Sequence, residues 1–168
     1  DNLAVHARLS QYKDDIEQNK SSDYVYSTTQ EAELYTKWQI TPAQNILIGS
    51  TFKDIKGDVY SKNLWGGKDV KYKESVDTMG YFAQHQYQKN GLATQVGVRV
   101  EDNDKFGTHT VGQGAIRYQV LPLTSIYANI GSAFRAPTTN DLYAMSWGAN
   151  PNLKPEESFS YEIGVDQK

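Results

Sequence analysis

The chain has 168 residues, which is enough for one domain with a core of its own. Its net charge is -3, with both signs mixed along the sequence, so no basic stripe indicates a nucleic-acid partner. It contains no cysteine, which excludes disulfides, thiolate metal sites and cysteine nucleophiles.

The mean hydropathy is low, at -0.66. No run of about 18 apolar residues is present, which excludes a transmembrane helix. A membrane β-barrel remains compatible with these values, because its lipid-facing and lumen-facing residues alternate and their hydropathies cancel. The 12 tyrosines and three tryptophans suit the aromatic girdles of such a barrel, although soluble β-sandwiches also use many tyrosines.

Residues 1–6 lack the basic and apolar regions of a signal peptide. A secreted barrel needs such a peptide in its precursor. We therefore expect either that it has been removed or that the chain starts inside a longer protein, and we favour the second interpretation.

Alternating apolar and polar residues predict β-strands along most of the chain. The clearest run covers residues 92–101, where Val96, Val98 and Val100 share one face with Leu92 and Thr94. The pattern recurs at 158–166 and, less regularly, at 3–9. We predict eight strands, at about residues 2–12, 30–40, 46–55, 77–88, 92–102, 109–120, 125–135 and 157–166.

The predicted connections alternate in length. Those at 41–45, 89–91 and 121–124 are short, whereas those at 13–29, 56–76, 103–108 and 136–156 are mostly long and polar. Outer-membrane barrels have this asymmetry, with the short turns in the periplasm. Most predicted strands have roughly nine to twelve residues, close to the 9–11 that cross a tilted bilayer path.

Arg99 and Arg117 interrupt two of these runs and suit a watery lumen better than lipid. The sequence thus predicts an all-β fold, an antiparallel transmembrane β-barrel. A soluble antiparallel β-domain is the alternative fold, and a complete eight-stranded structural or adhesin-like barrel is the alternative within the membrane class.

Three stretches resemble the TonB-dependent receptor family, most closely its vitamin B12 (cobalamin) type. They read TMGYFAQHQYQKNGLATQVGVRVED at 78–102, RVEDNDKFGTH at 99–109 and GSAFRAPTTNDLYAMSWGANPNLKPEES at 131–158. The FRAPT and NPNLKPE segments within the third stretch are the most specific to the family. Residues 1–76 match only in their strand rhythm and in a polar loop after the first strand.

The resemblance implies a piece of a larger wall, because receptors of this family are 22-stranded barrels with a plugged lumen. Residues 1–168 are then a partial barrel domain, and the plug, the TonB-contacting segment and the C-terminal strands are absent from it. The implied location is the bacterial outer membrane. The implied partners are cobalamin, TonB through the absent plug, outer-membrane lipid and lipopolysaccharide, with a ferric siderophore or haem as alternative cargo and no enzymatic activity.

The predicted loop at 136–156 is the first candidate ligand site. Pro137 ends the preceding strand, and residues 138–143 fit one helical turn capped by Thr138 or Thr139. Apolar anchors suit a large, partly apolar corrinoid. The candidate anchors are Tyr143, Met145 and Trp147 here and Trp65 in the loop at 56–76. A rigid structural loop, and for Trp65 a girdle residue on the lipopolysaccharide side, are the alternatives.

The predicted loop at 13–29 carries clustered carboxylates, which suit calcium because this ion takes six to eight oxygen ligands. The resemblance also implies calcium, which orders extracellular loops in cobalamin receptors. The candidate ligands are Asp14, Asp15, Glu17 and Asp23, and a solvated acidic loop is the alternative. The three histidines, His6, His85 and His109, fall in different predicted strands without ligand spacing, so no histidine metal site is predicted.

Overall fold

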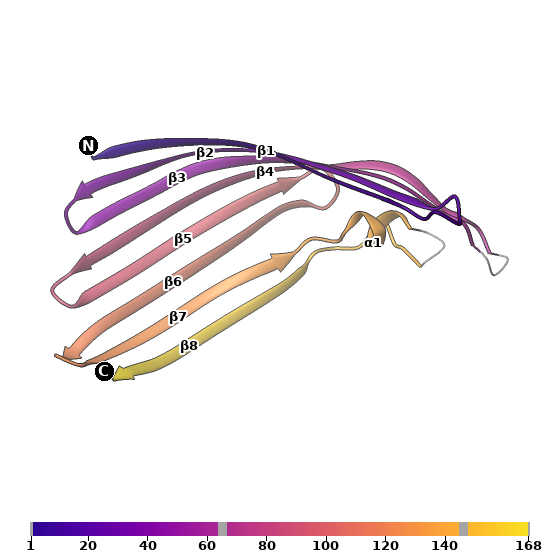
Figure 1. Cartoon of the computed structure of the whole chain (residues 1–168). Coiled ribbons are helices and arrows are strands. Elements are labelled where there is room, and N and C mark those ends of the chain that lie inside the picture. Colours follow the sequence, from indigo (N-terminus) through magenta and orange to yellow (C-terminus); the bar gives the residue numbers. More distant parts are fainter. Residues whose placement is uncertain (1, 64–66, 145–147, 168) are drawn as a thin grey trace.

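One antiparallel sheet of eight strands makes up most of the molecule, and each strand pairs with its neighbours in sequence (Figure 1). The structure is a computed structural model that describes residues 2–63, 67–144 and 148–167. The elements are β1 (Leu3–Glu17), β2 (Tyr24–Thr41), β3 (Gln44–Ser61), β4 (Val70–Lys89), β5 (Leu92–Asn103), β6 (Gly107–Leu121), β7 (Thr124–Arg135), α1 (Thr139–Tyr143) and β8 (Glu156–Gln167).

The sheet is curved and open. Its two edges are β1 and β8, which lie apart in Figure 1, and no pairing joins them among the described residues. The alternative of a complete eight-stranded barrel is therefore wrong, since closure would require β1 to bond to β8.

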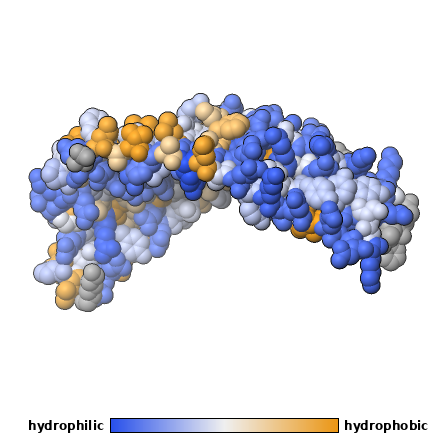
Figure 2. Space-filling model, turned by 45° about the horizontal axis from the view of Figure 1, so that its top comes forward, coloured by the Kyte–Doolittle hydropathy of each residue, from blue (hydrophilic) through white to orange (hydrophobic). Residues whose placement is uncertain are grey.

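The convex face of the sheet carries a band of exposed apolar side chains (Figure 2). Cross-strand partners share a face, so the register places Val98 of β5 beside Ala83 of β4 and Gly112 of β6 on this side. Exposed members of the band come from all eight strands and include Leu3, Val5, Leu9, Leu34, Trp38, Ile48, Phe52, Met79, Tyr81, Val96, Val98, Ile116, Ile126, Ile130, Tyr161 and Ile163.

The exposure of these side chains decides between the two fold classes proposed from the sequence. Val96 is 61% exposed and Val98 is 47% exposed, whereas the core of a soluble domain would bury both. The run from Leu92 to Val100 covers about 26 Å at 3.3 Å per residue. Because barrel strands tilt by about 40°, this run rises about 20 Å along the barrel axis, which is most of an apolar band about 25 Å tall.

The three short turns lie together at one end of the sheet (Figure 1). They centre on residues 42–43, 90–91 and 122–123. The middle turn needs two left-handed residues, and Asn90 (φ 52°) and Gly91 (φ 77°) are the pair that a two-residue hairpin of this kind prefers. All three were predicted, and so was the loop at 136–155.

Two of the predicted long loops are wrong. β1 and β2 have 15 and 18 residues and leave only residues 18–23 as their connection. β3 and β4 have 18 and 20 residues, so residues 56–61 and 70–76 of the predicted loop at 56–76 belong to strands. The extensions of β1 and β2 are largely polar and lack a regular apolar alternation. Those of β3 and β4 carry Val59, Val70, Tyr72 and Val76 on one face, an alternation that was not recognised from the sequence.

The helix α1 has 5 residues. Among the described residues, no helix is both long enough and apolar enough to cross a membrane. Helix α1 lies under the concave side of the sheet, near the end with the longer connections (Figure 1).

Candidate functional site on the concave face

Glutamine side chains form a hydrogen-bonded ladder across the concave face, from β4 through β5 to β6. The Gln86 amide donates to Gln95 (3.2 Å), and the Gln95 amide donates to Gln84 (3.3 Å). Gln113 of β6 adds a third amide that donates to Gln84 (3.4 Å). Amides both donate and accept, so this ladder offers further sites of either kind to whatever fills the lumen.

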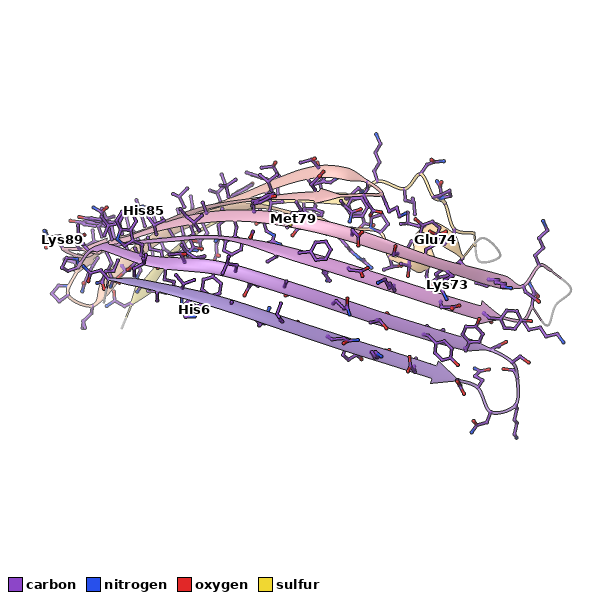
Figure 3. All side chains as sticks on the ribbon, turned by 90° about the horizontal axis from the view of Figure 1, so that it is seen from above. His6, Lys73, Glu74, Met79, His85 and Lys89 are labelled. Atoms are coloured by element: carbon purple, nitrogen blue, oxygen red, sulfur yellow. The ribbon has the colours of Figure 1, made fainter. Side chains whose placement is uncertain are left out.

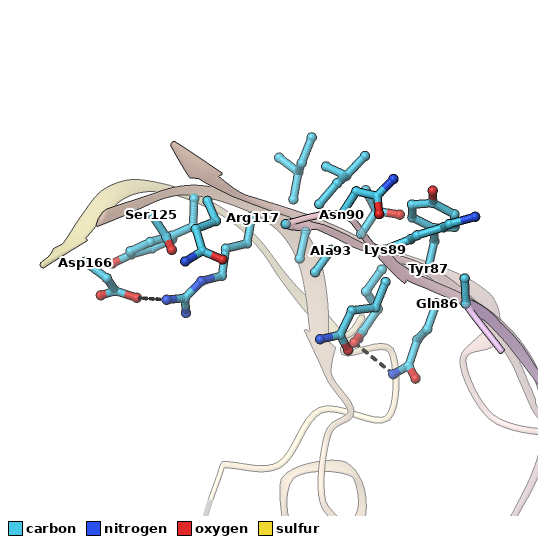
Figure 4. Close-up of a pocket in the computed structure, with 18 of the residues that line it drawn as sticks. Gln86, Tyr87, Lys89, Asn90, Ala93, Arg117, Ser125 and Asp166 are labelled. Carbon is cyan, nitrogen blue, oxygen red and sulfur yellow. Dashed lines mark hydrogen bonds and ion pairs between the residues drawn. The ribbon is translucent and has the colours of Figure 1, made fainter. Parts of the chain in front are cut away.

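A hollow of about 1050 Å³ opens on this face next to the short turns. Figure 4 shows part of its lining, with Arg117 of β6 joined to Asp166 of β8 at 2.9 Å. Between them, Tyr127 of β7 donates its hydroxyl to Glu162 (2.9 Å). Gly164 makes room for the Tyr127 ring, which would have to shift if that position carried a side chain.

Two arginines form ion pairs on the concave face, further from the turns. Arg99 donates to the Thr51 hydroxyl (2.8 Å), forms an ion pair with Glu101 and stacks its guanidinium over the Phe82 ring. Arg8 pairs with Glu31 at 2.8 Å and approaches Glu33 at 3.8 Å. The prediction that Arg99 and Arg117 face the lumen is therefore correct.

Local sequence fixes the short helix in the loop at 136–155. Thr138 is its N-cap, and its hydroxyl accepts a hydrogen bond from the Asp141 amide (3.2 Å). The Asp141 carboxylate accepts in return from the Thr138 hydroxyl (2.7 Å) and amide (2.9 Å), which holds the pKa of Asp141 below its usual value. This capping box starts the helical turn that was expected from the sequence.

The helix docks on the concave side of the β3 and β4 extensions. The Tyr72 hydroxyl donates to Asn140 Oδ1 (2.6 Å) and lies 3.3 Å from Thr139 Oγ1. Leu142 is only 2% exposed. Below the helix, a small apolar cluster consists of Val59, Val70, Tyr72 and Ala144. Residues 139–144 are thus anchored to a strand about 70 residues earlier, at one mouth of the concave face.

Of the four candidate ligand anchors, the described residues include only Tyr143. Its ring lies 5.9 Å from the Tyr72 ring at a tilt of 41° and packs, partly buried, against the apolar cluster. Its contact with a ligand stays a prediction. Met145, Trp147 and Trp65 lie outside the described residues.

The four candidate calcium ligands are spread over the first hairpin. Asp14 and Asp15 are adjacent on β1 and so point to opposite faces. Glu17 accepts from the Tyr26 hydroxyl, and Asp23 accepts from the Lys62 amide (2.8 Å). Within the described part of the chain, no three acidic or histidine side chains group in a way that could hold a metal ion.

The glutamine ladder and the Tyr72 anchor were not predicted from the sequence. The sequence does contain a signal for the ladder. Gln95 lies on the same face of β5 as Arg99, and Gln113 lies on the same face of β6 as Arg117, because each pair is an even number of residues apart. No comparable signal exists for Tyr72, whose partners Thr139 and Asn140 are far away in sequence.

Curated proteins similar to this chain include vitamin B12 transporters. "Vitamin B12 transporter BtuB" of Photobacterium profundum is 50% identical over 68 residues, which are 40% of this chain and 11% of that protein. The protein of the same name from Vibrio vulnificus (strain YJ016) is 28% identical over 142 residues, 84% of this chain and 22% of the relative. The chain therefore matches about a fifth or less of the length of these relatives.

Solved structures with the same fold include larger receptors and transporters. The ferric enterobactin receptor PfeA of Pseudomonas aeruginosa, as its G324V mutant, superposes with a TM-score of 0.74 over 99% of this chain and 29% of the receptor, at 16% identity. A copper transporter, OprC, superposes with a TM-score of 0.66 over 99% of this chain and 33% of that one, at 14% identity. At these identities the likeness concerns the fold alone.

The family described as "TonB dependent receptor-like, beta-barrel" matches residues 2–168, which is nearly the whole chain. This match agrees with the open antiparallel sheet, its lipid-facing band and its polar concave side. The chain is therefore part of an outer-membrane β-barrel and belongs to the TonB-dependent receptor family.

Proposed function

We propose that this chain forms part of the barrel wall of an outer-membrane receptor that takes up cobalamin or a related corrinoid. The observation that carries this proposal is the 50% identity over 68 residues with a vitamin B12 transporter. The fold does not identify the cargo, since a ferric enterobactin receptor has the same fold at 16% identity.

The two faces of the sheet suit the two tasks of such a wall. The convex band meets lipid, and the concave side offers amides, arginines and carboxylates to a wet lumen. The anchored helix α1 lies at the mouth of that lumen, where Tyr143 presents a partly buried ring. Aromatic and apolar groups with a few polar ones around them suit a large ligand of mixed polarity.

We propose further that a plug and the site for TonB lie in other parts of a longer receptor. The matched part of the Vibrio vulnificus relative is 22% of its length, and an open sheet of eight strands needs more wall to close. The receptor family moves small molecules, and the proposal assigns no catalytic step to this segment.

Calcium ordering of the first hairpin is part of the proposal, because Asp14 and Asp15 are exposed carboxylates near the end with the longer connections. Since the two point to opposite faces, each would need ligands from other segments of the receptor to complete a coordination shell of six to eight oxygens.

Equilibrium binding to the full-length receptor tests the cargo. We expect saturable binding of cobalamin that tightens when calcium is added and is not displaced by a ferric siderophore or by haem. Binding of a ferric siderophore or of haem in place of cobalamin would refute the corrinoid assignment and leave the family membership intact. Cobalamin binding that is equal with and without calcium would refute the calcium assignment alone.

A further inference from the structure

Two aspartates face each other across β3 and β4 on the convex side of the sheet. Asp54 and Asp77 are direct cross-strand partners, one outward row beyond Phe52 and Met79 of the lipid-facing band. Figure 3 shows Met79 midway along β4, and Asp77 lies between Met79 and Lys73 on the same strand. Carboxylates directly opposite each other repel and destabilise a sheet, so something must offset the repulsion of this pair.

Asp54 is buried, with only 9% of the residue exposed. Its Oδ2 atom lies 2.8 Å from the Lys56 ammonium group, which supplies a donor. Its Oδ1 atom has less than 1 Å² of accessible surface, and no donor among the described residues reaches it, not even that of Gln30, its neighbour on β2. Buried polar atoms are almost always hydrogen-bonded, and bulk water has no access to this one. A donor for Oδ1 must therefore come from an adjacent side chain.

Asp77 is the side chain best placed to supply that donor. The carboxyl groups of Asp54 and Asp77 lie within hydrogen-bonding reach of each other. Two ionised carboxylates are both acceptors, so a hydrogen bond between them requires a proton on one of the two. Asp77 is exposed and has no ion pair within the described part of the chain, whereas Asp54 already pairs with Lys56. The proton therefore belongs on Asp77.

A third carboxylate increases the excess of negative charge at this place. The Asp77 amide donates to Asp104 Oδ1 (3.0 Å), which holds the Asp104 carboxylate beside the pair. Lys56 pairs with Asp54 at 2.8 Å and Lys105 with Asp104 at 3.4 Å, so two ammonium groups meet three carboxyl groups. Desolvation, the charges of Asp54 and Asp104 and the hydrogen bond with Asp54 raise the pKa of Asp77, and the charge of Lys56 opposes them only in part. Since Asp77 is exposed at the polar margin of the band, water can deliver and remove its proton.

A metal ion is the other ligand that could neutralise carboxylates. Calcium takes six to eight oxygen ligands, whereas the Lys56 ammonium group already lies on Asp54. Across the described ranges, no three acidic or histidine side chains are grouped so that they could hold a metal ion. A proton needs only one donor oxygen and one acceptor oxygen, and the two aspartates provide both.

We propose that Asp54 and Asp77 form a proton-binding site, in which the protonated Asp77 carboxyl group donates a hydrogen bond to Asp54 Oδ1. This bond ties β3 to β4 where two negative charges would otherwise push the strands apart. Because the folded state holds the proton more tightly, the added stability is complete below the ordinary value of 3.8 and is lost as the pH rises through the folded pKa of Asp77. The site is independent of the cargo that the receptor carries, since it lies on the convex side of the sheet.

The test follows hydrogen exchange in the full-length receptor in detergent. Protection factors of the amides at residues 52–56 and 75–79 should fall by about three- to tenfold between pH 4 and pH 8, since one unit of pKa shift corresponds to a factor of about ten. Asp77→Asn supplies a permanent N–H donor without a charge, so it should keep the protection of the acid form at pH 8. Asp58→Asn is the matched control on the same face of β3, because the Asp58 carboxylate already has the Tyr24 hydroxyl (3.2 Å) and Lys73 (3.4 Å) as partners. This control should retain the pH step.

Asp77→Ala distinguishes a shared proton from simple repulsion. It removes the donor and leaves Asp54 Oδ1 buried without a partner, so protection at pH 4 should drop by about three- to tenfold below that of the unaltered receptor, whereas Asp77→Asn should show no drop. Equally raised protection in both variants would mean that Asp77 only repels Asp54, and the proposal would be overturned. Protection that does not change with pH in the unaltered receptor would also overturn it. So would protection that rises with added calcium or magnesium chloride and falls again with a chelator, because a metal ion would then hold the pair.

Discussion

The convex face has two regions that share strands and register but differ in chemistry. In the lipid-facing band Val96, Leu34 and Ile48 are each about half exposed or more. Beyond Gln11, Gln30, Asp54 and Asp77, the outward positions of β1 to β4 form a second region, the upper outer face, which carries tyrosines, lysines and carboxylates. The backbone hydrogen bonds of β2, β3 and β4 continue unbroken from one region to the other. Sheet pairing therefore sets where the strands run, and the surrounding solvent sets which side chains the outward positions carry.

The largest expected difference between the regions is in their tolerance of charge. Val98→Arg places a cation in the middle of the band and should cost about 2–4 kcal/mol of unfolding free energy in lipid. Thr28→Arg makes the same change on the same face beyond the band and should cost no more than about 0.5 kcal/mol. Denaturant unfolding of the full-length receptor from phospholipid vesicles measures both, and equal costs would remove the distinction between the two regions.

Two glycines of β3 differ in the same way on the concave side of the sheet. A side chain at Gly49, level with the band, would meet Tyr35 Cβ at 2.5 Å and the Leu34 carbonyl oxygen at 2.7 Å. Gly49→Ala should therefore destabilise the receptor by about 1–3 kcal/mol through overpacking.

Gly57, further along the same strand and on the same face, is the control for that measurement. An added methyl group there would lie 3.4 Å from the Tyr72 ring and 3.5 Å from Thr139 Oγ1, which are ordinary contact distances. Gly57→Ala should change the unfolding free energy by less than about 0.5 kcal/mol. A loss at Gly57 as large as that at Gly49 would show that α1 packs more closely on the extension than these distances indicate.

The docking of α1 can be weakened without touching the band. Tyr72→Phe removes the hydroxyl that donates to Asn140, which should cost about 1 kcal/mol and act locally. Hydrogen exchange at residues 139–144 should speed up by about fivefold, while exchange in β5 stays unchanged. Tyr60→Phe removes a hydroxyl from the opposite face and should leave exchange in α1 as it was; faster exchange there would mean that the two faces are coupled.

The smallest expected effect is the pH dependence of the helix cap. The pKa of Asp141 is lowered from 3.8 by hydrogen bonds from the Thr138 side chain and backbone. Its ionised form therefore stabilises the folded turn above pH 3.8, and this contribution disappears as the pH falls through the lower folded value. Protection factors for the Leu142 amide, followed from pH 6 downward, should drop below pH about 4. Asp141→Ala should lower protection at pH 6 and abolish the acid step.

Much of this architecture could be predicted from single residues and their spacing. The parity of Val96, Val98 and Val100 against Gln95 and Arg99 identified the lipid and lumen faces, because a strand alternates its side chains whatever it packs against. Asn90-Gly91 identified a hairpin turn, and Thr138 with Asp141 identified a helix cap, since both depend on local backbone geometry.

The faces of the strands, the short turns and the family could all be predicted from the sequence. The extent of β1 and β2 depended on tertiary pairing, because residues such as Lys13 and Thr28 belong to largely polar runs and are held in strands by the hydrogen bonds to their neighbours. The position of α1 also depended on tertiary contacts, since the hydrogen bond of Tyr72 with Asn140 joins residues that no local pattern relates. A two-residue periodicity appears where one face of a strand meets lipid or an apolar contact, and it is absent where both faces meet water, as along most of the β1 extension.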